Sequence, residues 1–189
     1  MRDKKLNSGE RQHGKTLLEI EAWHKWRYAE TMKYIAGKTI LDMGCGVGYG
    51  SFIMSSFAEK VYAIDDSNEA IEFALSNYYC GNINYSCCDV LDYDPPEGIE
   101  VVVGLEIMEH VKDTDAFMKK IEQISPERVV ISTPNIKCPM GENKWHHKHY
   151  GLDELVDLYW RLGYRPIRAE LIYFNKSLTN FIVFQKGEA

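Results

Sequence analysis

Long apolar runs are missing from this chain of 189 residues. A stretch without a charged side chain runs from residue 43 to residue 58, none in the chain is longer, and it contains four glycines and three serines. This stretch is too short and too polar to cross a bilayer. The first five residues are mostly charged and lead into polar residues, so no apolar signal-peptide region follows them. We therefore expect a cytoplasmic protein without a membrane span.

Cysteine pairs with C-x-x-C spacing, internal repeats and low-complexity tracts are also missing. Five cysteines are an odd number, which favours reduced thiols over a disulfide framework or a structural zinc site. The composition, 45% hydrophobic and 26% charged, is that of an ordinary globular protein. We expect residues 1–15 to form a mobile N-terminal segment and residues 16–189 to form a single domain.

The chain lacks the excess of positive charge that is typical of nucleic-acid-binding proteins. Its 22 basic and 28 acidic residues give a formal net charge of −6. A general nucleic-acid-binding face is therefore not expected.

Strands and helices are predicted to alternate along the chain. Apolar spacing of three or four residues predicts a helix from Thr16 to Gly37, with an inward face formed by Leu18, Ala22, Trp26, Ala29 and Met32. Four later helices are expected. The first follows the glycine-rich turn and ends near residue 57, the second and third begin after the capping residues Ser67 and Asp113, and the fourth covers 152–159. Strands are predicted at 38–43, 60–64, 83–87, 99–105, 128–132, 167–174 and 180–184.

This alternation predicts an α/β fold with a doubly wound, seven-stranded, mostly parallel sheet of the Rossmann-like type. Strands separated by helices run parallel, whereas the last two strands are joined only by a short turn. The C-terminal strand is therefore expected to be antiparallel.

Glycines follow the first predicted strand in the pattern Asp42-x-Gly44-x-Gly46-x-Gly48. The dinucleotide-binding pattern G-x-G-x-x-G fails, because Tyr49 or Ser51 stands where its third glycine is required. The second strand ends in two consecutive acids and the third is followed by another acid. These are Asp65, Asp66 and Asp89.

Together these three elements resemble the class I S-adenosylmethionine-dependent methyltransferases. The resemblance implies S-adenosyl-L-methionine as cofactor, Asp65 on its ribose hydroxyls, Asp89 near its adenine and Arg27 at its methionine carboxylate. The full set of implied cofactor-binding residues is Arg27, Asp42, Gly44, Cys45, Gly46, Gly48, Asp65, Asp66, Asp89, Val90 and Leu105. In the alternative interpretation, the acids cap helices and Arg27 lies on a helix surface.

A second glycine pattern, residues Gly9–Thr16, satisfies the phosphate-loop motif G-x-x-x-x-G-K-[ST]. That motif works only where a buried strand precedes the loop, and residues 1–8 are too few and too polar to form one. A phosphate-loop nucleotide hydrolase is therefore kept only as an alternative. The segment Gly9-Glu10-Arg11 also resembles the lead-in of bacterial methyltransferases that act on sugars and cell-surface glycans.

A Glu-x-x-Glu-His pattern follows the fourth predicted strand, at Glu106, Glu109 and His110. In a helical turn, residues i, i+3 and i+4 share one face, so these side chains are expected to converge. Two carboxylates and an imidazole suit Mg²⁺ or Mn²⁺.

This pattern resembles that of the ubiquinone-biosynthesis O-methyltransferases. It also resembles that of the small-RNA 3′-terminal 2′-O-methyltransferases, in which a later histidine completes a divalent metal site. That resemblance places His146 as the fourth ligand beside Glu106, Glu109 and His110. The candidate catalytic residues are His110, His146 and Glu106, and a role for them without any metal stays open.

The predicted function is methylation of a hydroxyl on a sugar or another small hydroxylated molecule. The gap between the fifth strand and the last helix is aromatic and polar, which suits such an acceptor. The alternatives are metal-dependent methylation of a terminal RNA ribose and a non-catalytic cofactor-binding module. No sequence feature indicates the oligomeric state.

Overall fold

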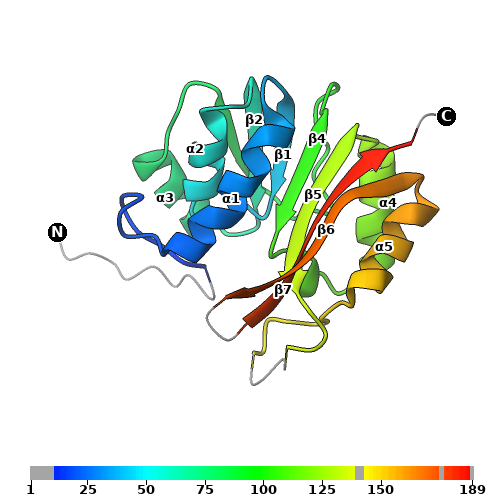
Figure 1. Ribbon diagram of the computed structural model, residues 1–189. Helices are drawn as coiled ribbons and strands as arrows, with labels where there is room; N and C mark the ends of the chain where they lie inside the picture. Colours follow the sequence, from blue (N-terminus) through cyan, green and yellow to red (C-terminus); the bar gives the residue numbers. More distant parts are fainter. Residues whose placement is uncertain (1–10, 139–142, 175–176, 188–189) are drawn as a thin grey trace. The chain divides into compact units, whose positions relative to one another are not determined.

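The protein is described by a computed structural model that covers residues 11–138, 143–174 and 177–187 (Figure 1). The chain divides into two compact units, residues 1–94 and residues 95–189. Gly9 and Glu10, which begin the phosphate-loop pattern, lie outside the described residues.

The first unit contains a parallel sheet in the order β3-β2-β1, with helices beside it (Figure 1). Its strands are β1 (Thr39–Met43), β2 (Lys60–Asp65) and β3 (Ile83–Cys87), and its helices are α1 (Ala22–Ile35), α2 (Tyr49–Ser55) and α3 (Asn68–Asn77). Ser67 caps α3 as predicted, since its hydroxyl accepts from the Ala70 backbone N–H. The three strands lie within one residue of their predicted bounds.

The prediction for α1 was wrong in its start and in its buried face. The helix begins at Ala22 instead of Thr16, after a series of turns and bends. Leu18 is 93% exposed and Ala29 is exposed. The buried residues of the helix are instead Arg27, Tyr28, Thr31 and Ile35.

The physical reason is the contact between α1 and α2. The Tyr28 ring packs directly on Gly50, where an added Cβ would lie 2.0 Å from the ring carbon Cζ. Tyr28 also meets Tyr49 edge to face, with ring centroids 5.5 Å apart. This long-range packing, and not the local spacing of apolar residues, determines which face of α1 is buried.

The second unit contains the strand order β4-β5-β7-β6. Its elements are β4 (Val101–Leu105), the 3₁₀ helix η1 (Met108–His110), α4 (Thr114–Ile124), β5 (Arg128–Pro134), α5 (Leu152–Arg161), β6 (Tyr164–Phe174) and β7 (Ser177–Lys186). β4 and β5 are parallel, whereas β7 runs antiparallel to both β5 and β6. Asp113 caps α4 as predicted.

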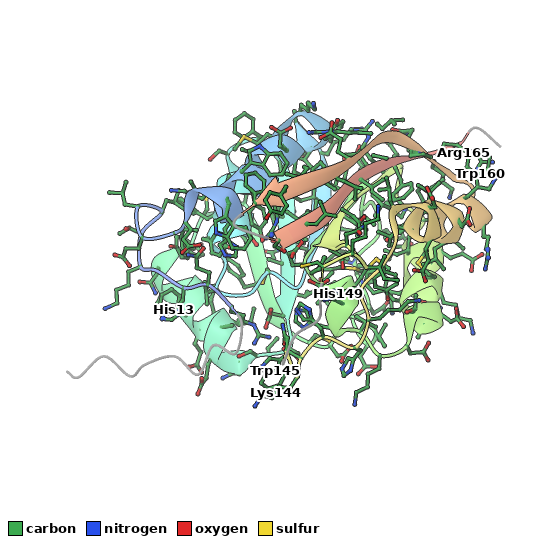
Figure 2. All side chains as sticks on the ribbon, turned by 60° about the horizontal axis from the view of Figure 1, so that its bottom comes forward. His13, Lys144, Trp145, His149, Trp160 and Arg165 are labelled. Carbon is green, nitrogen blue, oxygen red and sulfur yellow. The ribbon has the colours of Figure 1, made fainter. Side chains whose placement is uncertain are left out.

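A tight turn at Gly163 (φ +84°) joins α5 to β6. Across this turn the Arg165 guanidinium stacks over the Trp160 ring, 3.4 Å from its centroid (Figure 2). The Tyr159 ring stacks on Phe184 of β7, with centroids 4.2 Å apart. These two contacts connect α5 to β6 and β7. Both strands are longer than the sequence predicted.

The seven strands of the described residues confirm the predicted fold class, which is α/β and mostly parallel, with an antiparallel strand at the C-terminal end. No helix within residues 11–138, 143–174 and 177–187 has the length and apolar character needed to span a membrane.

Candidate functional site

In the first unit, the loop after β1 is built on glycines with left-handed backbone conformations. Gly44, Gly46 and Gly48 have φ values of +76°, +55° and +86°, which other residues adopt only at a cost. The backbone N–H groups of Gly44 and Cys45 donate to the Ile64 carbonyl of β2, at 2.9 and 2.8 Å. The glycine pattern therefore produces a tight loop at the carboxyl ends of β1 and β2, where α/β sheets bind ligands.

The Asp65 carboxylate closes this loop. Its Oδ2 accepts from the Gly46 backbone N–H at 2.9 Å, and its Oδ1 accepts from the Ser67 backbone N–H at 3.0 Å. Asp65 is buried. It therefore connects the loop after β1 to the start of α3.

Arg11 was not among the predicted site residues, although it lies on Asp65. Its Nη2 donates to Asp65 Oδ1 at 2.8 Å and to Asp66 Oδ1 at 2.7 Å, and its Nε donates to Asp65 Oδ2 at 3.4 Å. Its side chain also covers the loop, since an added Cβ at Gly46 would lie 3.8 Å from Arg11 Cγ and Cδ. The only sequence signal was its place in the Gly9-Glu10-Arg11 segment.

Asp42, the acid that begins the glycine pattern, is buried below the loop. Its Oδ2 accepts from the Ser51 hydroxyl at 2.6 Å. Burial raises the pKa of Asp42 from 3.8 to about 7, although the hydrogen bond from Ser51 acts in the opposite direction. Asp42 therefore keeps its proton well above the pH at which an exposed aspartate loses it.

The other predicted cofactor residues of this unit lie in varied surroundings. Arg27 is buried, with its guanidinium over the Trp23 ring at 4.5 Å, so the surface interpretation of this residue is wrong. Asp66 is exposed and bound to Arg11. Asp89 is exposed and accepts from the Leu91 backbone N–H, while the neighbouring Val90 is buried.

In the second unit, Leu105 ends β4 and Glu106 turns the chain. Glu106 has φ +57°, an uncommon value for a residue other than glycine. Its backbone N–H donates to the Ser132 carbonyl at 2.8 Å, and its Oε1 accepts from the Ser132 hydroxyl at the same distance. Glu106 is thereby fixed to the end of β5.

Three of the four predicted metal ligands lie together. Glu109, His110 and His146 each offer one ligand atom, and these atoms all lie within 4.8 Å of one another. Glu109 is buried, and its Oε2 accepts from the Thr133 hydroxyl at 2.9 Å. Glu106 does not belong to this group of three.

Backbone contacts hold the loop before α5 against η1. The His147 N–H donates to the Glu109 carbonyl at 2.7 Å, and His110 Nδ1 lies 3.1 Å from the Trp145 carbonyl. Because a carbonyl only accepts, His110 carries a proton on Nδ1, and Nε2 is its ligand atom. Figure 2 labels Trp145 and His149 on this loop.

A family model described as a methyltransferase domain covers residues 35–156, which fall in both units.

Curated relatives carry related names. A protein of Mycobacterium tuberculosis named "Probable S-adenosylmethionine-dependent methyltransferase" is 26% identical over 158 residues, 78% of this chain and 57% of the relative. A "Ubiquinone biosynthesis O-methyltransferase" of Bradyrhizobium sp. is 29% identical over 113 residues, 58% of this chain and 45% of the relative. The chain thus spans about half the length of these relatives.

Solved structures share the fold. Magnesium protoporphyrin IX methyltransferase from Synechocystis, with bound S-adenosylhomocysteine, has a TM-score of 0.75 at 13% identity, over 94% of this chain and 90% of that chain. Burkholderia thailandensis 1,6-didemethyltoxoflavin-N1-methyltransferase has a TM-score of 0.74 at 16% identity, over 93% and 83%.

Replacing Asp42 by Asn is expected to change how stability depends on pH. Between about pH 4 and pH 7 the folded chain keeps the Asp42 proton and the unfolded chain loses it, so this group's stabilising contribution falls as pH rises. Asn keeps an acceptor for Ser51 and cannot titrate. Urea unfolding of both proteins from pH 4 to pH 8 should therefore show Asp42→Asn gaining up to ~4 kcal/mol relative to the unsubstituted protein. Parallel pH profiles would contradict the raised pKa.

Proposed function

Because the chain belongs to the methyltransferase domain family, we propose that it transfers the methyl group of S-adenosyl-L-methionine to a hydroxyl of a sugar or another small hydroxylated molecule. Two groups of side chains support this proposal. In the first unit, the Asp65 carboxylate is hydrogen-bonded to the glycine loop, and in the second unit the Glu109 carboxylate lies close to two imidazoles.

Asp65 is the central cofactor residue of the proposal. A carboxylate that is held by backbone N–H groups is suited to accept hydrogen bonds from the two ribose hydroxyls. Gly44 and Gly46 carry no side chain, so the cofactor's amino-acid chain is proposed to approach the loop backbone once Arg11 has moved off Gly46. Asp66, Asp89 and Val90 are proposed to surround the adenosine of the cofactor. Arg27 is proposed to pair with the carboxylate of the cofactor's methionine part.

Arg11 and the ribose would use the same acceptors. A carboxylate offers about four lone-pair sites, and each oxygen of Asp65 already receives one backbone N–H and one Arg11 N–H. The cofactor therefore has to displace Arg11 from Asp65 when its ribose binds there.

The second unit is proposed to activate the acceptor. In methyl transfer, an acceptor oxygen forms a bond to the methyl carbon, and the carbon–sulfur bond breaks with its electron pair left on sulfur. The hydroxyl proton must go to a base, and Nε2 of neutral His110 or His146 has the lone pair for this. Glu106 is proposed to orient the acceptor.

Glu109, His110 and His146 also fit a divalent metal ion. Such an ion, when bound, supplies a Lewis acid that lowers the pKa of an acceptor hydroxyl. The group contains two imidazoles and one carboxylate, whereas Mg²⁺ prefers all-oxygen surroundings. The residues therefore favour Mn²⁺ over Mg²⁺.

The acceptor class is supported by relatives and by charge. The Bradyrhizobium relative is named as an O-methyltransferase, which favours oxygen as the methylated atom. A terminal RNA ribose is the second candidate, because its vicinal diol could bind a metal held by these residues. The net charge of −6 makes a small acceptor the better candidate.

Replacing Asp65 by Asn should weaken cofactor binding by at least ~10-fold, because charge-assisted hydrogen bonds to the ribose are lost. Calorimetric titration with S-adenosylhomocysteine measures this. Asp66→Asn, at the exposed neighbouring acid, is the matched control and should lose much less. Unchanged affinity in Asp65→Asn, with a normal circular dichroism spectrum, would exclude Asp65 as the ribose ligand.

Replacing Arg11 by Ala should strengthen cofactor binding by ~2- to 5-fold, because the cofactor no longer has to break a partly exposed ion pair. Arg11→Lys keeps the charge and should give an intermediate affinity. The same titration applies. Weaker binding in Arg11→Ala would mean that Arg11 helps to hold the cofactor.

Titration of Mn²⁺ into the protein should show one site, and Glu109→Gln should weaken it by more than ~100-fold, since loss of an outer-shell partner alone costs 10–100-fold. Gln keeps an acceptor for Thr133. Glu106→Gln is the control, and it should keep Mn²⁺ affinity while turnover falls. If the unsubstituted protein gives no heat with Mn²⁺ or Mg²⁺, the metal proposal fails and the histidine base remains.

A further inference from the structure

A chain of hydrogen bonds runs from the Cys138 carbonyl through His149 and ends on His146 Nδ1. His149 Nδ1 lies 2.9 Å from the Cys138 carbonyl oxygen, and His149 Nε2 lies 2.7 Å from His146 Nδ1. His149 is buried, whereas the intervening His147 is exposed. His149 was not among the predicted site residues.

The order of donors in this chain follows from its carbonyl end. A carbonyl oxygen can only accept, so His149 carries a proton on Nδ1. In neutral His149 the other ring nitrogen, Nε2, is then an acceptor. The proton between the two rings consequently belongs to His146 Nδ1.

This arrangement determines which nitrogen of His146 can do chemistry. With Nδ1 protonated, neutral His146 has its lone pair on Nε2, and only a nitrogen with a lone pair can bind a metal or accept a substrate proton. His110 has the same tautomer, because its Nδ1 donates to the Trp145 carbonyl. Both rings are thus set to use Nε2 as the functional atom.

We propose that His149 is a positioning residue, which fixes the tautomer and ring orientation of His146 so that Nε2 serves the Glu109–His110–His146 group. The proposal rests on the function proposed above for that group. In this role His149 binds neither the metal nor the acceptor itself and acts through its hydrogen bond to His146.

Replacing His149 by Leu removes both hydrogen bonds and keeps a buried apolar side chain. His146 Nδ1–H then loses its partner and the ring can rotate or change tautomer. Loss of such outer-shell partners typically weakens metal binding by 10–100-fold. His149→Gln supplies an amide N–H and an amide oxygen for the two roles and should restore most of the affinity. His147→Leu, at the exposed neighbour, should change nothing.

Two measurements test this. Long-range ¹H–¹⁵N NMR of the metal-free protein reports the tautomer of each histidine, and it should show Nδ1–H for His146 in the unsubstituted protein and a mixture in His149→Leu. Mn²⁺ titration should show a 10–100-fold loss in His149→Leu and recovery in His149→Gln.

The outcomes separate this inference from the function on which it rests. If His146 carries its proton on Nε2 in the unsubstituted protein, or if His149→Leu changes neither tautomer nor Mn²⁺ affinity, His149 does not position His146. If Mn²⁺ does not bind the unsubstituted protein, the metal proposal fails, and the NMR result still decides the role of His149. If His149→Leu does not fold, the tautomer in the unsubstituted protein and the His149→Gln titration decide it.

Discussion

The hydrogen bond from the Gly46 backbone N–H to the Asp65 carboxylate is the interaction on which the first unit's site depends. It holds a loop of left-handed glycines against the end of β2, and the same carboxylate accepts from the first turn region of α3 through Ser67. Burying a carboxylate is costly unless hydrogen-bond donors compensate for the lost water. Each oxygen of Asp65 accepts one backbone N–H and one N–H of the Arg11 guanidinium.

In the second unit, the buried Glu109 carboxylate accepts a hydrogen bond from the Thr133 hydroxyl at the end of β5. Asn180 of β7 donates to the Tyr150 carbonyl at 3.0 Å and so anchors the loop before α5. His146 lies near Glu109 because both flanking stretches of its loop are tied to neighbouring elements. The site is thereby formed by packing of elements distant in sequence.

The sequence predicted the family and the strands, and the reasons lie in local chemistry. Gly44, Gly46 and Gly48 form the tight loop after β1, and the resemblance to methyltransferases that rests on them is confirmed by the family match. The convergence of Glu106 with Glu109 was expected from helical spacing. Glu106 lies outside the group formed by Glu109, His110 and His146. It has positive φ, and η1 is a 3₁₀ turn that begins two residues later, so the spacing of a regular α-helix does not apply here.

Arg11 and His149 show what sequence alone could not provide. Arg11 acts across 54 residues on Asp65, and no periodic pattern encodes such a contact. His149 is one of three histidines within four residues, and only burial and a carbonyl partner distinguish it from His147. Tertiary structure decides both roles.

The contact between Tyr28 and Gly50 assigns a separate meaning to the glycine that follows the loop motif. A methyl group at residue 50 would collide with the aromatic ring, and α1 would have to move off α2. Glycine is therefore needed at residue 50 because α1 packs there, whereas it is needed at residues 44, 46 and 48 because of their positive φ values. The family match begins at residue 35, after the ring that imposes this demand. Whether another residue is tolerated at position 50 should therefore depend on whether the preceding helix packs there, and not on cofactor binding.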